Sequence, residues 1–141
     1  MTTSSHFPVT VLSAEDKLYS GSAVSVTIPT ESGEITVLPH HAPLISTLHA
    51  GELIVRHTHG EERIFVGGGV VEFTPGNECR VLADVAERAD AIDEAAATAA
   101  REHAQKALAE AHGEADVAAA QIALLNAIMR LKIVERRKHY K

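Results

Sequence analysis

The chain changes character abruptly at about Asp90, and this change constrains its fold more than any other feature. All five prolines and eight of the nine glycines lie before this point, among short apolar runs. After it there is no proline, the only glycine is Gly113, and alanine dominates. Proline and glycine interrupt regular structure, whereas alanine favours the helix. We therefore expect two domains, a β-structured domain at 1–87 and a helical one at 88–141.

The first part predicts a β-sandwich. Between Phe7 and Val85, short alternating apolar runs are separated by turn residues at Glu31-Ser32-Gly33, His59-Gly60 and Pro75-Gly76-Asn77. Eight or more strands at this spacing are typical of a sandwich or barrel. The run 19–28 is expected to form one strand, interrupted near Gly21. Gly67-Gly68-Gly69 precedes a strand and not a helix, which indicates a close backbone approach or a bulge rather than a phosphate cradle.

Within this part, the stretch 33–45 joins a strand to a rigid corner. Pro39 and Pro43 bracket the corner, and each fixes its own φ and pushes the preceding residue toward extended geometry. His40 and His41 therefore lie on a stiff bend, which suits a contact surface.

The second part predicts two helices that form an antiparallel hairpin around His112-Gly113. The expected apolar stripes are Ile92, Ala95, Ala96, Ala99, Ala107, Leu108 and Ala111 on the first helix, and Val117, Ala120, Leu124, Ile128 and Leu131 on the second, which starts at about Ala115. Alanine in place of leucine forfeits about 2 kcal/mol of burial per position. Such a hairpin is marginal alone, and both a plain structural appendage and a detachable element with several docked positions remain open.

Charge is distributed unevenly along the chain. The net charge is −6, and the last twelve residues alone carry +5. A basic tip on an acidic chain indicates an acidic docking partner. Nucleic acid is a weaker interpretation, because there is no broad basic face and no aromatic pair near the tip. The single cysteine, Cys79, excludes an intramolecular disulfide and is interpreted as a small strand residue.

No membrane insertion is expected. The N-terminus lacks the basic start and apolar run of a signal peptide. The longest stretch without charge, 117–129, is too short and too polar to span a bilayer. The protein is expected to be soluble, although it could attach to a membrane complex.

The most tempting metal signal is His57-Thr58-His59 followed by Glu62, which resembles the first motif of cupins and gives a metal-dependent enzyme as the alternative function. The spacing from histidine to glutamate is too short, however, and no suitable histidine follows residue 77. A polar hairpin end is favoured. No nucleophile elbow or carboxylate pair is present, so we expect no catalytic site, no metal and no cofactor.

Several motifs together resemble the epsilon subunit of F-type ATP synthases. They are Val11-Leu12-Ser13-Ala14-Glu15, Tyr19-Ser20-Gly21, Gly33-Glu34 with Leu38-Pro39-His40-His41-Ala42-Pro43-Leu44, Gly67-Gly68-Gly69-Val70-Val71-Glu72 and Leu82-Ala83-Asp84-Val85-Ala86-Glu87. The similarity covers essentially the whole chain, in the family's order.

The resemblance implies a non-catalytic subunit of the rotating central stalk, which couples proton translocation to ATP synthesis at the cytoplasmic face of a bacterial membrane. The partners would be the gamma subunit and the c-ring, contacted by the loop matching Glu34 and His41. The hairpin would lie folded or extend to inhibit ATP hydrolysis. Basic residues would then meet the catalytic beta subunit; the candidates are Arg130, Lys132, Arg136, Arg137 and Lys138.

This sequence departs from the family pattern at two positions. Members that bind ATP carry an Ile/Leu-Asp-x-x-Arg-Ala pattern, which here reads Ile92-Asp93-Glu94-Ala95-Ala96-Ala97, with Ala96 in place of the arginine. Loss of that guanidinium removes a phosphate partner and puts ATP binding in doubt. His40 replaces the usual glycine of the corner, and we expect this to alter the backbone of the corner or its contacts.

Overall fold

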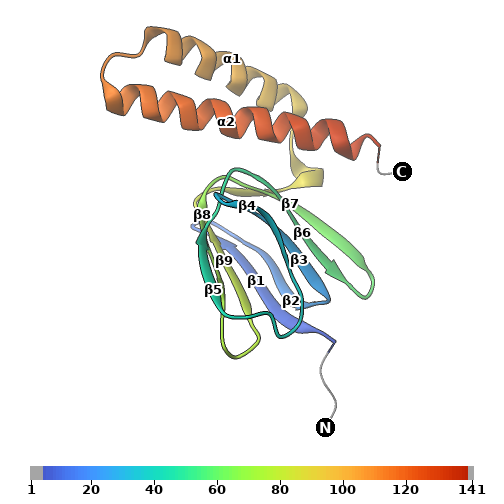
Figure 1. The fold of residues 1–141 in the computed structure, drawn as a ribbon. Coiled ribbons are helices and arrows are strands. Elements are labelled where there is room, and N and C mark those ends of the chain that lie inside the picture. Colours follow the sequence, from blue (N-terminus) through green and yellow to red (C-terminus); the bar gives the residue numbers. More distant parts are fainter. Residues whose placement is uncertain (1–4, 140–141) are drawn as a thin grey trace. The chain divides into compact units, whose positions relative to one another are not determined.

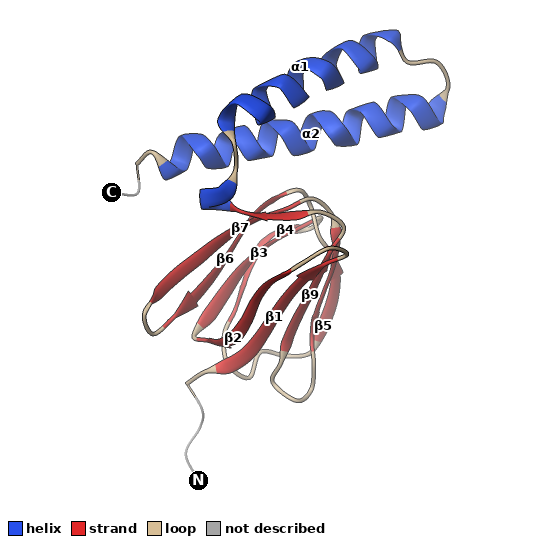
Figure 2. Cartoon of the chain, turned by 180° about the vertical axis from the view of Figure 1, so that it is seen from behind, coloured by secondary structure: helices blue, strands red, loops and turns tan. Residues whose placement is uncertain are grey.

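A computed structural model describes residues 5–139 of the chain. It divides into two compact units, Met1–Arg88 and Ala89–Lys141. All strands lie in the first unit and both α-helices in the second (Figures 1 and 2). The predicted order, a β-sandwich followed by a helical hairpin, is confirmed.

The first unit consists of two five-stranded sheets. The first sheet contains, in spatial order, β2 (Lys17–Ala23), β1 (Phe7–Ser13), β9 (Cys79–Ala83), β8 (Gly69–Phe73) and β5 (Leu44–Thr47). The second contains β10 (Ala86–Arg88), β7 (Gly60–Val66), β6 (Gly51–His57), β3 (Ser25–Thr30) and β4 (Gly33–Val37). β1 and β9 run parallel, and the other neighbours run antiparallel.

Large side chains fill the space between the sheets. Alternate residues of a strand point to one face, so Phe7, Val9 and Val11 of β1 all enter the core and are at most 1% exposed. The rings of Phe7 and Phe73 lie 5.5 Å apart between centroids, in a tilted arrangement. In β1, the apolar residues that alternate in the sequence are therefore the residues that are buried in the core.

One prediction about the strands is wrong, and one short strand was not predicted. The run 19–28 forms two strands in different sheets, because the chain bends at Val24, whose N–H donates to the Arg56 carbonyl at 2.8 Å. The short strand β10 had no prediction; its register opposite residues 64–66 depends on a partner distant in the sequence.

The expected close approach at the triple glycine is confirmed. Gly69 has a φ of 119°, and a Cβ there would lie 2.1 Å from the carbonyl oxygen of Leu82. Only glycine fits at this position, where β8 meets β9.

The second unit contains a 3₁₀ turn, η1 (Ala89–Ala91), and the helices α1 (Glu94–Glu110) and α2 (Glu114–Arg137). The Asp93 carboxylate caps α1 by accepting from the Ala96 N–H at 3.1 Å. The chain reverses at Gly113 as predicted, but Gly113 is not a left-handed cap of the first helix. α1 ends at its C-cap Ala111, and Gly113, with a φ of 86° and a ψ of 158°, is the N-cap of α2.

The apolar stripe predicted for the first helix is partly wrong. Ala97 and Ala104 are buried, whereas Ala95, Ala96 and Ala99 are exposed. Alanine occupies so many positions of α1 that the sequence hardly distinguishes its faces. On α2 the predicted stripe is buried or half-buried throughout.

Candidate interaction surfaces

The proline corner is a tight turn followed by an extended segment. The His41 N–H donates to the Leu38 carbonyl at 3.0 Å, with Pro39 at the second position and His40 at the third. His40 has a φ of 65°, the left-handed value that a type II turn requires and glycine normally supplies. Its own N–H donates to Oδ1 of Asn77 at 2.6 Å. The histidine therefore keeps a glycine-like backbone, held by a neighbouring loop.

His41 belongs to the same corner but is only half-exposed. Its Nδ1 lies 2.6 Å from the Ala42 carbonyl, and because a carbonyl only accepts, Nδ1 donates. The imidazole and the ring of the buried Phe73 form a T-shaped contact, with centroids 5.6 Å apart. These two contacts fix the ring against the sandwich.

Glu34 lies far from His41. It is an exposed residue at the start of β4, whereas His41 follows the other end of that strand. The three residue steps from Glu34 to Val37 alone span about 10 Å of extended chain. The structure thus does not bring together the two residues expected to share one contact loop.

The end of the sandwich that carries Glu34 is acidic. Register pairs and hydrogen bonds place the ends of β1, β9, β5 and β3 together with the start of β8 at this end. A cavity of about 110 Å³ opens there between Ser13, Ala14, Glu15, Asp16, Asp84, Val85 and Ala86. Glu31 lies in the β3–β4 turn and Glu34 near the start of β4, at the same end.

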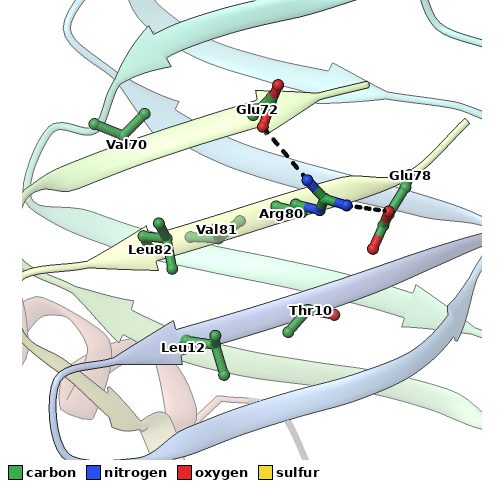
Figure 3. A pocket seen from close by; sticks show the side chains of 8 residues that line it. All are labelled: Thr10, Leu12, Val70, Glu72, Glu78, Arg80, Val81 and Leu82. Carbon is green, nitrogen blue, oxygen red and sulfur yellow. Dashed lines mark hydrogen bonds and ion pairs between the residues drawn. The ribbon is translucent and has the colours of Figure 1, made fainter. Parts of the chain in front are cut away.

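An apolar row crosses the outer face of the first sheet, which the sequence analysis missed. Leu12 pairs with Leu82 between β1 and β9, and Leu82 pairs with Val70 between β9 and β8. Leu82 is 58% exposed and Val70 is 43% exposed. Ile45, 73% exposed, lies on β5 opposite Glu72, beside this row. We call Leu12, Leu82 and Val70 the outer apolar row (Figure 3).

A polar row borders the outer apolar row. The Arg80 guanidinium lies 3.0 Å from a Glu78 carboxylate oxygen and 4.0 Å from one of Glu72 (Figure 3). Together the two rows line a hollow of about 300 Å³. An apolar patch with a polar border is typical of a protein interface. The sequence signal that could have predicted this surface is leucine and valine at positions of β1, β8 and β9 that the period-two alternation directs away from the core.

The basic residues at the end of the hairpin have different surroundings. Arg137 Nη1 donates to the Ala89 carbonyl at 2.6 Å, and Lys138 Nζ lies 3.4 Å from the Glu94 carboxylate. Lys132 and Arg136 are exposed, and Arg130 is half-buried. The five candidates therefore occupy one end of α2, and two of them contact the start of the same unit.

The turn end of the hairpin is loosely filled. A groove of about 410 Å³ runs between the helices, lined by Ala104, Ala107, Ala111, Ala119, Ala120 and Ala123 with His103, Glu110 and Asp116. We call it the alanine groove. Helices in proteins owe most of their stability to tertiary packing, so the groove is consistent with a marginal hairpin.

α2 carries more apolar surface than α1 covers. By length and composition it could cross a membrane, with a mean hydropathy of 1.6 over an 18-residue window, of which 22% is buried. Ile122 is 61% exposed. Because α2 pairs with α1 in a hairpin, we interpret its remaining apolar surface as a protein-binding face.

The residues of the ATP-binding pattern have structural positions. Asp93 caps α1 through the Ala96 N–H, Ile92 is buried, and the Ala96 side chain is exposed. An arginine at 96 would therefore project from the first turn of α1. Alanine there supplies no cation for a phosphate.

The histidine hairpin end is a cluster of polar contacts. His57 Nδ1 accepts from the His59 N–H at 3.2 Å, while Nε2 lies 3.8 Å from the Glu62 carboxylate. The carboxylate of Glu62 also lies 3.5 Å from the Arg88 guanidinium. Burial and the nearby Glu62 raise the pKa of Tyr19, which stacks on His57. Between residues 5 and 139 no group of three His, Cys, Asp or Glu side chains could hold a metal ion.

Comparison with known families explains both units. Residues 6–89 match the profile described as ATP synthase, Delta/Epsilon chain, beta-sandwich domain. Residues 90–135 match ATP synthase, Delta/Epsilon chain, long alpha-helix domain. The cupin alternative based on His57, His59 and Glu62 is not supported, because these residues lie inside the first of these matches.

Individual relatives match over most of their length. The chain is 46% identical to the ATP synthase epsilon chain of Bordetella parapertussis, over 93% of this chain and 96% of that one. It is 50% identical to the ATP synthase epsilon chain of Bordetella petrii, over 84% and 86%. A chain of the Euglena gracilis mitochondrial ATP synthase shares the fold, with a TM-score of 0.79 at 20% identity, over 99% of this chain and 85% of that one. The chain therefore belongs to the epsilon-chain family of ATP synthases.

Proposed function

We propose that this chain is a non-catalytic subunit of the central stalk of an F-type ATP synthase. The sandwich docks it to the rotor, and the hairpin restrains ATP hydrolysis. The observation that carries this proposal is the contrast between the units: a well-packed sandwich with an exposed apolar row, and a loosely filled hairpin with a basic end.

The outer apolar row supports docking to the gamma subunit. Leu82 and Val70 expose apolar surface that water disfavours, and Arg80 with its carboxylate partners provides a polar rim. Burial of a large apolar side chain at the centre of an interface is worth about 1–3 kcal/mol. Leu82→Ala is therefore expected to weaken gamma binding about tenfold or more, whereas Thr47→Ala on the same face is expected to change it little.

Glu34 and His41 are assigned to separate contacts, because they lie toward opposite ends of β4. Glu34 belongs to the acidic end of the sandwich and is proposed to face basic groups of the c-ring. His41 is proposed to contact gamma beside the proline corner. Glu34→Gln then weakens association with the c-ring in a salt-dependent manner, and His41→Ala leaves that association unchanged.

The hairpin is proposed to inhibit hydrolysis by extending toward the catalytic head, where its basic residues meet an acidic segment of the beta subunit. The exposed Lys132 and Arg136 and the apolar surface of α2 support a second docked position. ATP binding to the folded hairpin is not expected, since Ala96 replaces the arginine. The host complex is proposed to lie at the cytoplasmic face of a bacterial membrane, with this chain peripheral and not inserted.

Truncation tests the division between the units. Removal of residues 91–141 is expected to leave gamma binding intact and to raise the ATP hydrolysis rate of the reconstituted complex. Charge reversal of Arg136 and Arg137 in the full chain should weaken inhibition, and added salt should reduce the difference from the natural chain. Loss of gamma binding by the truncated chain, or an unchanged hydrolysis rate, would contradict the proposal.

A further inference from the structure

The two ends of the hairpin are held in different ways. At the turn end the helices line the open alanine groove. At the open end α2 contacts η1, and Ile133 and Val134 are buried. Two polar contacts also join the last residues of the hairpin to its first ones, although they lie more than 40 positions apart in the sequence. We call these two contacts the clasp.

Arg137 makes the more buried contact of the clasp. Its Nη1 donates to the carbonyl oxygen of Ala89 at 2.6 Å, and Ala89 is 5% exposed. A charged donor makes a stronger hydrogen bond than a neutral one. Withdrawal of Arg137 would leave the Ala89 carbonyl oxygen without this donor. An unsatisfied carbonyl in a buried residue costs free energy unless a water molecule donates in place of the guanidinium.

Lys138 makes the more exposed contact. Its Nζ lies 3.4 Å from both carboxylate oxygens of Glu94, the first residue of α1, and the two side chains are about half-exposed. Such pairs are individually weak and sensitive to salt. Lys138 also lies 3.7 Å from Glu135, but that pair is within one turn and does not join the ends of the hairpin.

We propose that the clasp masks Arg137 and Lys138, so that Glu94 and the Ala89 carbonyl compete with the acidic partner for the same two cations. The hairpin must release both side chains before they can bind elsewhere. Because one contact is weak and exposed, an acidic surface can displace Glu94 first and Ala89 second. This inference rests on the proposed inhibitory function, but the clasp itself can be tested without it.

Hydrogen exchange of the isolated full chain tests the clasp. The variants are Glu94→Gln, which keeps the side-chain shape, Lys138→Gln, and the double variant. Glu135→Gln is the matched control, because it removes the other acidic neighbour of Lys138 and leaves the clasp intact. We expect Glu94→Gln to accelerate exchange of the amides at 92–97 and 134–138 about two- to fivefold, and Glu135→Gln to leave these rates unchanged.

The double variant separates the clasp from a simple effect on the helix start, where a carboxylate is favourable by itself. If the clasp exists, Glu94→Gln has little further effect once Lys138 is neutral. Additive effects of the two substitutions, equal acceleration by Glu135→Gln, or no acceleration by Glu94→Gln would each overturn the clasp.

The masking of Arg137 and Lys138 is tested in the reconstituted complex. The measured quantity is the concentration of this chain that reduces the ATP hydrolysis rate by half. Glu94→Gln should lower it about two- to fivefold, and Glu135→Gln should not change it. An unchanged value for Glu94→Gln, with the natural chain inhibiting, would overturn masking. If the natural chain does not inhibit at all, the proposed function fails and masking with it, while the exchange result still decides whether the clasp exists.

Discussion

The two units are stabilised in opposite ways. In the sandwich, Phe7, Phe73 and many branched aliphatic side chains are almost fully buried between the two sheets. In the hairpin, the residues buried within the helices are mostly alanine, and a groove of about 410 Å³ remains between them. Most strands of the sandwich pair with a strand distant in the sequence, as β1 does with β9 and β3 with β6, whereas α1 and α2 are joined by one short turn.

This difference matches the two roles proposed for the chain. A unit that keeps contact with a rotor needs a fixed surface, and close packing supplies one. A unit that changes position needs a small free-energy difference between its states. A helix interface made mostly of alanine, with half-exposed ion pairs, keeps this difference small. Four predictions, from the largest expected effect to the smallest, test the comparison.

Phe73→Ala should strongly destabilise the sandwich. The ring is 1% exposed and contacts Phe7 and His41, so its removal leaves a cavity. The expected loss is about 3–5 kcal/mol in the free energy of unfolding, measured by urea denaturation. The control is Ile45→Ala, which removes an exposed side chain and should change stability by less than about 0.5 kcal/mol. Similar losses for the two variants would mean that the sandwich core is loosely packed.

Alkaline pH should destabilise the sandwich through Cys79. Burial raises the pKa of this thiol to about 12, and the charge of Glu78 adds to the effect. Between about pH 9 and pH 12 the unfolded chain loses the proton and the folded chain keeps it, so stability falls by at most about 1.4 kcal/mol per pH unit.

The measurement compares urea unfolding of the natural chain and of Cys79→Ala from pH 8 to pH 10.5, where the difference should reach about 2 kcal/mol. The variant cancels the contribution of every other titrating group. Parallel pH profiles for the two proteins would show that the folded thiol ionises as readily as the unfolded one.

Ala107→Leu should stabilise the hairpin by partly filling the alanine groove, which the half-buried Ala107 lines. A half-buried leucine adds about 1 kcal/mol, which should slow exchange of α1 and α2 amides about fivefold and weaken inhibition of hydrolysis. Ala100→Leu is the matched control, because Ala100 is exposed and lies outside the groove. If both variants slowed amide exchange equally, the cause would be an effect of leucine on its own helix and not filling of the alanine groove.

His40→Gly should stabilise the sandwich slightly. A left-handed φ of 65° is unfavourable for an L-residue, and glycine removes that cost at the expense of a more flexible unfolded chain. We expect a net gain of about 0.5 kcal/mol in urea unfolding. Asn77→Ala, which removes the acceptor for the His40 N–H, should act in the opposite direction; a loss on His40→Gly would show that the imidazole itself stabilises the corner.

Much of the fold was predictable because it is encoded locally. The turn at Pro39, the hairpin at His59-Gly60, the reversal at Gly113 and the change near Asp90 each depend on residues adjacent in the sequence. The family resemblance, confirmed by the matches over 6–135, rests on similar short motifs. The faces of α1 were not predictable, because alanine at Ala95, Ala96 and Ala99 looks the same as alanine at Ala97 and Ala104.

The sequence by itself determined the order of the two units, the position of the proline corner and the basic end of the chain. Only the tertiary structure decided that Glu34 and His41 lie apart, that Leu12, Leu82 and Val70 form one exposed row, and that Arg137 and Lys138 contact Ala89 and Glu94. The physical reason is distance along the chain. Turn and helix signals act over a few residues, whereas strand register and the closure of the hairpin join residues 40 to 70 positions apart.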